Sequence, residues 1–241
     1  RIDEIYLRNK FTDVYYKKVR EKVKFVVMGC SNSFENCFCV DMGTNKTDEY
    51  DMGIKVNADN IFLDIKNTEF LDTFSGEEKN FEMDFVEDNE VHVTIPENIN
   101  LEDIINLDLW REYDKRCIAC GKCNFVCPTC TCTTTQDIFY SENENVGERR
   151  RVWASCHVDG FTDMAGGHSF RPKHGDRMRF KVMHKISDFK KRFGYQMCTG
   201  CGRCDDACPE YISFSNCINK LNKAMEELAL ERKANEVVQN G

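Results

Sequence analysis

The stretch CIACGKCNFVCP at residues 117–128 contains four cysteines in the pattern C-x2-C-x2-C-x3-C, followed by a proline. The stretch CTGCGRCDDACP at residues 198–209 repeats this pattern. Such spacing is typical of the bacterial ferredoxin motif for a [4Fe–4S] cluster. Structural zinc sites use pairs of cysteines separated by a longer loop, so two compact runs of four cysteines fit zinc poorly. The two runs therefore predict two [4Fe–4S] clusters. The alternative is a structural adaptor protein whose cysteines bind zinc.

The ligands of each cluster follow from a rule for two-cluster ferredoxins, in which the fourth cysteine of each run usually ligates the other cluster. Cluster one is then predicted to be held by Cys117, Cys120, Cys123 and Cys208. Cluster two is predicted to be held by Cys198, Cys201, Cys204 and Cys127.

Seven of the 15 cysteines lie outside the two runs. Three of them share one loop after a predicted strand: Cys30, Cys37 and Cys39. They either bind a third cluster with a fourth ligand from elsewhere or are reduced, partly buried thiols, because free cysteine behaves as a small hydrophobic residue.

The other four cysteines show no complete ligand pattern. Cys130 and Cys132 follow the first run directly, so they are either spare ligands or packing residues beside a cluster. Cys156 and Cys217 are isolated in the sequence, and we expect both to be buried thiols.

Composition excludes several classes of protein. The 241 residues are 41% hydrophobic and 31% charged, and no stretch approaches the roughly 18 apolar residues that a membrane span needs. No secretory signal is visible, so we expect a cytoplasmic protein. The net charge of −8 argues against a nucleic-acid partner. Because 15 is an odd number of cysteines, they cannot all be paired in disulfides.

Residues 1–100 are expected to form an α+β domain. Apolar residues at helical spacing predict a helix over residues 4–22. Short apolar or alternating runs predict strands at residues 23–28, 54–56, 61–65 and 91–95.

Residues 101–241 are expected to form a mainly α-helical ferredoxin-like domain that carries two [4Fe–4S] clusters. A helix of about 18 residues is predicted from Asp176 to Gly194, with an apolar stripe at helical spacing. The stripe consists of Val182, Ile186, Phe189 and Phe193. A last helix is predicted from about Ser215 through the 220s.

No residue is predicted to be catalytic. The sequence has no phosphate-binding loop and no G-x-G-x-x-G after a strand, so we expect no nucleotide or flavin bound by this chain. The five histidines form no protease-like pattern. We expect them to lie at the surface or to be hydrogen-bonded within the core. His157 beside Cys156 and His168 after two glycines have the best case for a functional role.

A basic segment precedes the second run. Between Arg171 and Arg192 there are nine Lys or Arg residues and two Asp residues, a local balance of +7. Three interpretations remain open: a solvated helix face, compensation of the negative charge of the clusters, or docking of an acidic redox partner.

Three blocks of the sequence resemble the dicluster iron–sulfur subunit of the anaerobic sulfite reductases. They are residues 117–132, residues 148–168 with the segment ERRRVWASCHVDGFTDMAGGH, and residues 198–212. The middle block is the most specific, since many ferredoxins share the cluster motifs. A more distant resemblance is to the iron–sulfur beta subunits of soluble nickel–iron sulfhydrogenases.

The resemblance to the sulfite reductases implies an electron-transfer role. In that family, a flavin-bearing subunit oxidises NADH, and the iron–sulfur subunit passes the electrons to a sirohaem subunit that reduces sulfite to sulfide. The family also has an N-terminal cluster motif ending in Cys-Phe-Cys, which matches Cys37-Phe38-Cys39 with Cys30 before it. The resemblance therefore implies a third [4Fe–4S] cluster, whose fourth cysteine is expected upstream of Arg1.

Overall fold

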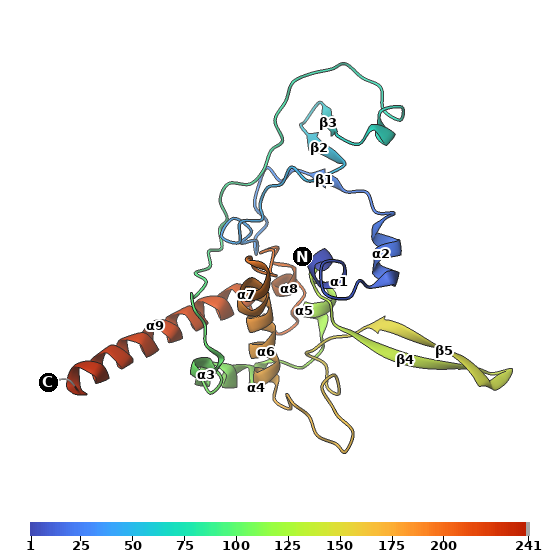
Figure 1. Ribbon diagram of the computed structural model, residues 1–241. Coiled ribbons are helices and arrows are strands. Elements are labelled where there is room, and N and C mark those ends of the chain that lie inside the picture. The colour runs from blue at the N-terminus through green and yellow to red at the C-terminus, as the bar shows by residue number, and fades with distance from the viewer. Residues whose placement is uncertain (240–241) are drawn as a thin grey trace. The chain divides into compact units, whose positions relative to one another are not determined.

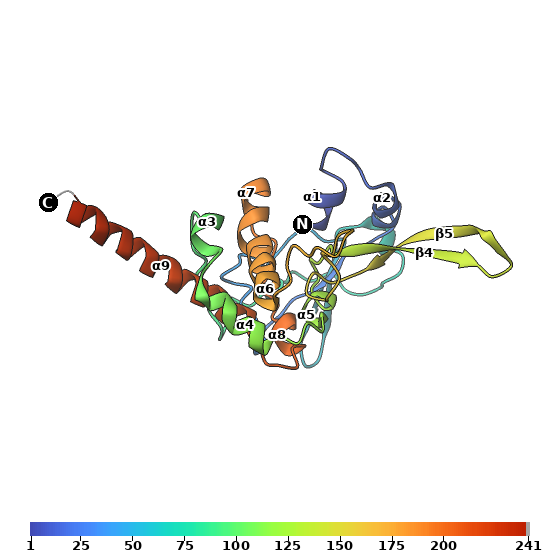
Figure 2. The same ribbon diagram turned by 90° about the horizontal axis from the view of Figure 1, so that it is seen from below.

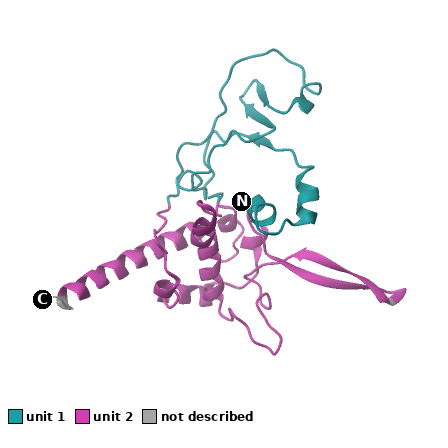
Figure 3. Ribbon diagram, viewed as in Figure 1, with its two compact units in different colours: residues 1–92, 199–201 teal, residues 93–198, 202–241 magenta. Residues whose placement is uncertain are grey.

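The computed structural model describes residues 1–239 and divides into two compact units. The first unit comprises residues 1–92 together with 199–201, and the second comprises residues 93–198 and 202–241 (Figure 3). No helix within residues 1–239 is both long enough and apolar enough to cross a membrane.

A three-stranded sheet organises the first unit (Figure 1). Strand β1 (Val26–Met28) runs parallel to β2 (Met52–Val56), which pairs antiparallel with β3 (Ile61–Ile65). A short 3-10 helix, η1 (Thr68–Phe70), follows β3. The strands predicted around residues 23–28, 54–56 and 61–65 are thus confirmed.

The first predicted helix is wrong in its length. Two short helices, α1 (Ile2–Tyr6) and α2 (Val14–Arg20), replace the single helix expected over residues 4–22. The break occurs because the Asp13 carboxylate accepts a hydrogen bond of 2.8 Å from the Tyr16 N–H and so starts a new helix.

The strand predicted at residues 91–95 is also wrong. Its alternating pattern is real, since Val93 is buried. However, the Thr94 N–H donates to the side chain of Asn219, at 2.9 Å, and no strand partner pairs with this segment in the described structure. The alternation reflects one-sided burial of an extended segment.

Short helices and one long helix form the core of the second unit. Helix α3 (Leu101–Ile104), the 3-10 turn η2 (Asp108–Trp110) and α4 (Arg111–Arg116) lead into the first cysteine run. Trp110 is fully buried, and its Nε1 atom donates to the Ile104 carbonyl at 2.6 Å. Helix α9 (Phe214–Gln239) contributes two fully buried side chains, Ile218 and Leu221. It extends well beyond the predicted 220s, and residues 240–241 lie outside the described part.

The predicted helix before the second run is confirmed. It consists of α6 (His174–Met183), a π-helical turn η3 (His184–Asp188) and α7 (Phe189–Phe193), and it stops at Gly194 with φ of 88°. Val182, Ile186 and Phe189 of the apolar stripe are buried. The wider π turn leaves the Lys185 carbonyl free to accept hydrogen bonds from the N–H groups of Met197, at 2.9 Å, and Cys198, at 3.1 Å. The helix thereby fixes the start of the second cysteine run.

An antiparallel hairpin corrects the expectation of a mainly helical second domain. Strands β4 (Thr133–Tyr140) and β5 (Asn143–Trp153) pair with Thr133 opposite Trp153, and the hairpin extends away from the helices of its unit (Figures 1 and 2). Arg149 binds Asp137 across the strands with two hydrogen bonds of 2.6 and 2.8 Å. Both units therefore mix helix and strand.

Candidate iron–sulfur site

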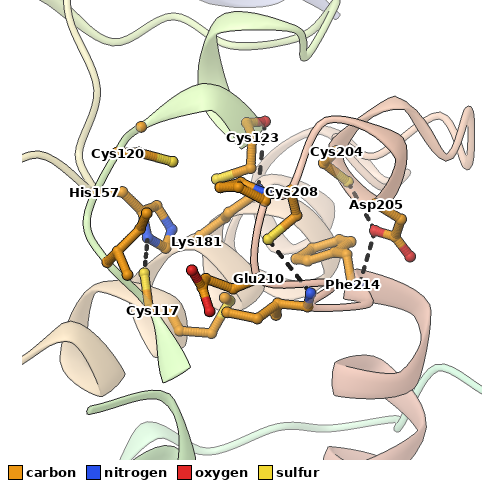
Figure 4. Close-up of a pocket in the computed structure, with 15 residues that line it drawn as sticks. Cys117, Cys120, Cys123, His157, Lys181, Cys204, Asp205, Cys208, Glu210 and Phe214 are labelled. Carbon is orange, nitrogen blue, oxygen red and sulfur yellow. Dashed lines mark hydrogen bonds between the residues drawn. The ribbon is translucent and has the colours of Figure 1, made fainter. Parts of the chain in front are cut away.

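Five cysteines line a single hollow in the second unit: the four predicted for cluster one, and Cys204, which is predicted for cluster two. Figure 4 shows the sulfur atoms of Cys117, Cys120, Cys123 and Cys208 around a common space. The structure therefore brings Cys208 of the second run to the three leading cysteines of the first run, as the cross-ligation rule requires. Assignment of these thiols as ligands stays a prediction.

Each run folds as a tight turn followed by one turn of helix. Helices α5 (Lys122–Phe125) and α8 (Arg203–Asp206) begin after Gly121 and Gly202, which have φ of 76° and 67°. These positive values lie in the left-handed region that only glycine adopts at little cost. At Gly121 a Cβ atom would also lie 2.7 Å from a methyl carbon of Val158. The glycines therefore let the chain reverse between consecutive thiols.

The thiols of the first hollow interact electrostatically. Burial raises the pKa of Cys117, and repulsion from Cys123, Cys120 and Cys208 adds to this effect, while a hydrogen bond from the Ala119 backbone opposes it. Four thiolates crowded together in this way need a positive group between them. An iron–sulfur core supplies that charge, because its irons take cysteine thiolates as ligands. The residues present therefore fit a [4Fe–4S] cluster.

A buried lysine lies between the two runs. Lys181 lines the same hollow, and its Nζ atom donates to the Cys123 carbonyl at 3.4 Å. Burial alone would lower the pKa of Lys181, but the thiolates of Cys123, Cys204 and Cys127 raise it above its ordinary value. The ammonium group is therefore charged and close to cysteines predicted for both clusters.

A buried histidine completes the wall of the first hollow. The Nδ1 atom of His157 lies 4.0 Å from the Cys117 sulfur, while its Nε2 atom is buried with no hydrogen-bond partner in the described structure. Burial lowers the pKa of His157 to about 3, and the nearby charges of Lys181 and Arg177 contribute. The imidazole is therefore neutral at physiological pH.

Three of the four cysteines predicted for cluster two lie in the second unit: Cys127, Cys198 and Cys204. Burial raises the pKa of Cys204, and Cys198 is among the groups that add to the increase. The Cys127 sulfur lies 3.5 Å from the Thr129 hydroxyl. The fourth cysteine, Cys201, belongs to the short segment 199–201 that groups with the first unit. The ligand set of cluster two therefore stays a prediction.

The three N-terminal cysteines lie close together within the first unit. Burial raises the pKa of Cys37, and Cys39, Cys201 and Cys30 contribute repulsion. The Cys37 sulfur donates to the Cys201 carbonyl at 3.7 Å. Gly200 allows this approach, because a Cβ atom there would lie 2.4 Å from the Phe38 carbonyl oxygen. The proposed third cluster stays a prediction, since no fourth thiol ligand for it is identified.

The basic segment separates into a buried set and an exposed set. Arg177, Lys181 and Lys185 are buried, and Lys185 donates to the carbonyl and the hydroxyl of Thr129 at 2.9 Å each. The exposed set is Lys173, Lys190, Lys191 and Arg192. The remaining two, Arg171 and Arg179, are half-buried. The buried cations point to charge compensation, and the exposed set is the part of the segment most open to a partner.

The individual roles of several of these residues were not predicted from the sequence. Lys181 and Lys185 are two members of a run of basic residues in the sequence. One feature of the sequence could have indicated that the two lysines are buried: they are four residues apart, and each directly precedes a residue of the apolar stripe, Val182 or Ile186. Burying an unpaired cation costs free energy, so each lysine would then need a partner.

Comparisons with known proteins agree with this geometry. Residues 116–212 match the family described as the 4Fe-4S dicluster domain. The chain is 30% identical over 240 residues to sulfhydrogenase 2 subunit beta of Pyrococcus furiosus, an alignment that covers 93% of this chain and 70% of that protein. No solved structure matches the chain significantly. The domain match confirms the prediction of two [4Fe–4S] clusters.

Proposed function

The chain belongs to the protein family that includes sulfhydrogenase 2 subunit beta of Pyrococcus furiosus, and from this membership we propose that it relays electrons within a multisubunit oxidoreductase. It is an iron–sulfur electron-transfer subunit. The observation that carries the proposal is the convergence of five thiols from two distant runs on one hollow. Each [4Fe–4S] cluster, when bound, supplies a site that gains or loses one electron.

The chain's own residues hold and tune these sites. Cys117, Cys120, Cys123 and Cys208 hold cluster one, and Cys198, Cys201, Cys204 and Cys127 hold cluster two. Because each run contributes to both sets, the two clusters are fixed as neighbours. The charged ammonium of Lys181 stabilises added negative charge near cysteines of both sets. The chain itself carries out no bond-making step.

The terminal step that we propose is reduction of sulfite to sulfide on a sirohaem-bearing subunit. The chain takes its electrons from a flavin-bearing subunit that oxidises NADH. The support is the resemblance of residues 148–168 to the dicluster iron–sulfur subunit of the anaerobic sulfite reductases. This block includes Ser155, Cys156 and His157, which are all buried in the second unit.

A second candidate is a nickel–iron hydrogenase as the terminal subunit. The alignment with sulfhydrogenase 2 subunit beta favours it, since that alignment spans nearly the whole of this chain. Both candidates give this chain the same task and differ in the partner.

Purification of the tagged chain from its native cells, without oxygen, distinguishes the two candidates. The sulfite proposal expects a co-purifying subunit with sirohaem absorption and NADH-dependent loss of sulfite. Nickel in stoichiometric amount, with hydrogen exchange and no sulfite loss, would replace it with the hydrogenase candidate. Cys117→Ala removes one predicted ligand of cluster one and so tests the relay directly. This variant should leave the complex assembled but slow electron transfer from NADH. An unchanged rate in that variant would contradict the relay itself.

A further inference from the structure

Three cysteines outside the two ferredoxin runs come together in the second unit. Cys130, Cys132 and Cys156 line a second hollow. The hairpin produces this arrangement, because β4 begins directly after Cys132 and β5 ends shortly before Cys156. The Ala154 N–H donates to the Cys132 carbonyl at 3.0 Å and so closes the base of the hairpin. Cys156, which is isolated in the sequence, is therefore a neighbour of Cys130 and Cys132 in the fold.

The three thiols form a hydrogen-bonded row. Cys130 donates to Cys132, and Cys132 donates to Cys156. The row ends at Asn124, whose Nδ2 atom donates to the Cys156 sulfur at 3.0 Å. The Cys156 sulfur therefore accepts hydrogen bonds from both the Cys132 thiol and the Asn124 amide.

Buried positive charge faces the same hollow. Lys181 and Lys185 both line it, and both are nearly inaccessible to solvent. A buried ammonium group is costly unless a negative group or strong acceptors compensate it. Lys181 also lines the hollow of cluster one, so its side chain contributes to the walls of both hollows. A group bound in the second hollow would therefore share a neighbouring charge with cluster one.

We propose that Cys130, Cys132 and Cys156 bind a further iron–sulfur cluster in the second hollow, in addition to the two clusters of the ferredoxin runs. Thiolates are the ligands that such clusters take from proteins, and a cluster with thiolate ligands is anionic. It therefore matches both the thiol row and the two buried lysines. Nothing in this arrangement uses the N-terminal cysteines, which lie in the other unit.

Three thiolates leave one position for a different ligand if the cluster has four irons. His184 lines the same hollow, and a neutral imidazole is a common metal ligand. A three-iron cluster would need no fourth ligand. In either case the cluster would exchange a single electron with cluster one, and no bond would form or break in that exchange.

The test compares the full-length chain with the triple variant Cys130→Ser, Cys132→Ser, Cys156→Ser after anaerobic reconstitution with ferrous iron and sulfide. The variant should lose about three to four irons and the matching sulfide per chain, and it should keep about eight irons at the two ferredoxin runs. Cys30, Cys37 and Cys39 are present in both chains, so any iron that they bind cancels in the comparison. Cys217→Ser, which changes a buried thiol outside both hollows, should lose none.

A second measurement on the unaltered chain covers the case in which the triple variant fails to fold. Iodoacetamide labelling followed by mass spectrometry should leave Cys130, Cys132 and Cys156 unlabelled in the loaded chain. The same thiols should become labelled after the iron is removed by chelation. Three results would overturn the proposal: equal iron in both chains, loss of stoichiometric zinc in place of iron, or labelling of these thiols in the loaded chain. A chain lacking iron at all sites would instead contradict the relay function.

Discussion

The imidazole of His157 faces Cys117 with its Nδ1 atom 4.0 Å from the thiol sulfur, in a wall that solvent does not reach. This contact links the block 148–168 to the first ferredoxin run. With its proton on Nδ1, the neutral imidazole donates toward the sulfur, and such a bond favours the more negative, reduced state of a cluster. The relationship makes His157 a residue that tunes cluster one.

Replacing His157 with Phe should lower the reduction potential of cluster one. Loss of a hydrogen bond that strengthens on reduction is worth about 1 kcal/mol, or about 40 mV for one electron. A redox titration followed by electron paramagnetic resonance measures the shift. His168→Phe is the matched control, because His168 is exposed, meets Phe170 edge-to-face and does not line the hollow of cluster one. Equal potentials in the two variants would show that His157 only fills space.

Removing the charge of Lys181 should have a larger effect that reaches both clusters. At an effective dielectric constant of about 20 and a separation of about 6 Å, one charge contributes about 3 kcal/mol, or about 120 mV. Lys181→Met should therefore lower both potentials, since its ammonium interacts with Cys123, Cys204 and Cys127. Lys190→Met, at an exposed position of α7, should shift them little. A shift confined to one cluster would contradict the shared position of Lys181.

Cross-ligation predicts that changing the fourth cysteine of one run disturbs the cluster of the other. Cys208→Ser should alter the spectrum of the cluster held by Cys117, Cys120 and Cys123, because Cys208 lines their hollow. Cys127→Ser should alter the site of Cys198, Cys201 and Cys204. Electron paramagnetic resonance of the reduced protein distinguishes the two sites, and Cys217→Ser is the control. If each change damages only the cluster of its own run, the ligand sets given above are wrong.

The cluster motifs could be predicted from sequence because ligand spacing is a local property. Three thiols within seven residues already define one side of a predicted cluster. Cys208 and Cys117 line one hollow, and the ligand set that the cross-ligation rule gives stays a prediction. The helix that ends at Gly194 was also predictable, since the stripe Val182, Ile186 and Phe189 reports its buried face. In each case the residues that decide the structure lie within a few turns of each other.

The remaining parts depend on contacts between distant residues. Cys156 was expected to be an isolated buried thiol, but the β4–β5 hairpin returns it to Cys130 and Cys132. The hairpin itself was missed because its polar strands carry no apolar face. Likewise, the alternation at residues 91–95 indicated burial of Val93 but not a strand, since pairing needs a partner that the sequence does not reveal.

The exposed part of the basic segment predicts a salt-dependent encounter with the electron donor or acceptor. Lys190 lies exposed on α7, whereas Lys191 also donates to the Ile99 carbonyl at 2.7 Å. Lys190→Glu therefore reverses a surface charge without breaking that bond. The variant should slow electron transfer with the partner subunit several-fold at low salt, because surface charges act mainly on the association rate.

The slowing should shrink as salt rises, since the Debye length falls from about 30 Å at 0.01 M to about 10 Å at 0.1 M. Stopped-flow mixing of the reduced chain with its partner at several ionic strengths measures this dependence. Lys223→Glu, on the exposed side of α9, is the matched control for a reversed charge elsewhere in the same unit. If both variants react alike at every salt concentration, Lys190 belongs to a solvated helix face and the exposed set docks nothing. If Lys190→Glu instead lowers the reduction potentials of the clusters at an unchanged association rate, the Lys190 charge compensates the negative charge of the clusters and does not dock a partner.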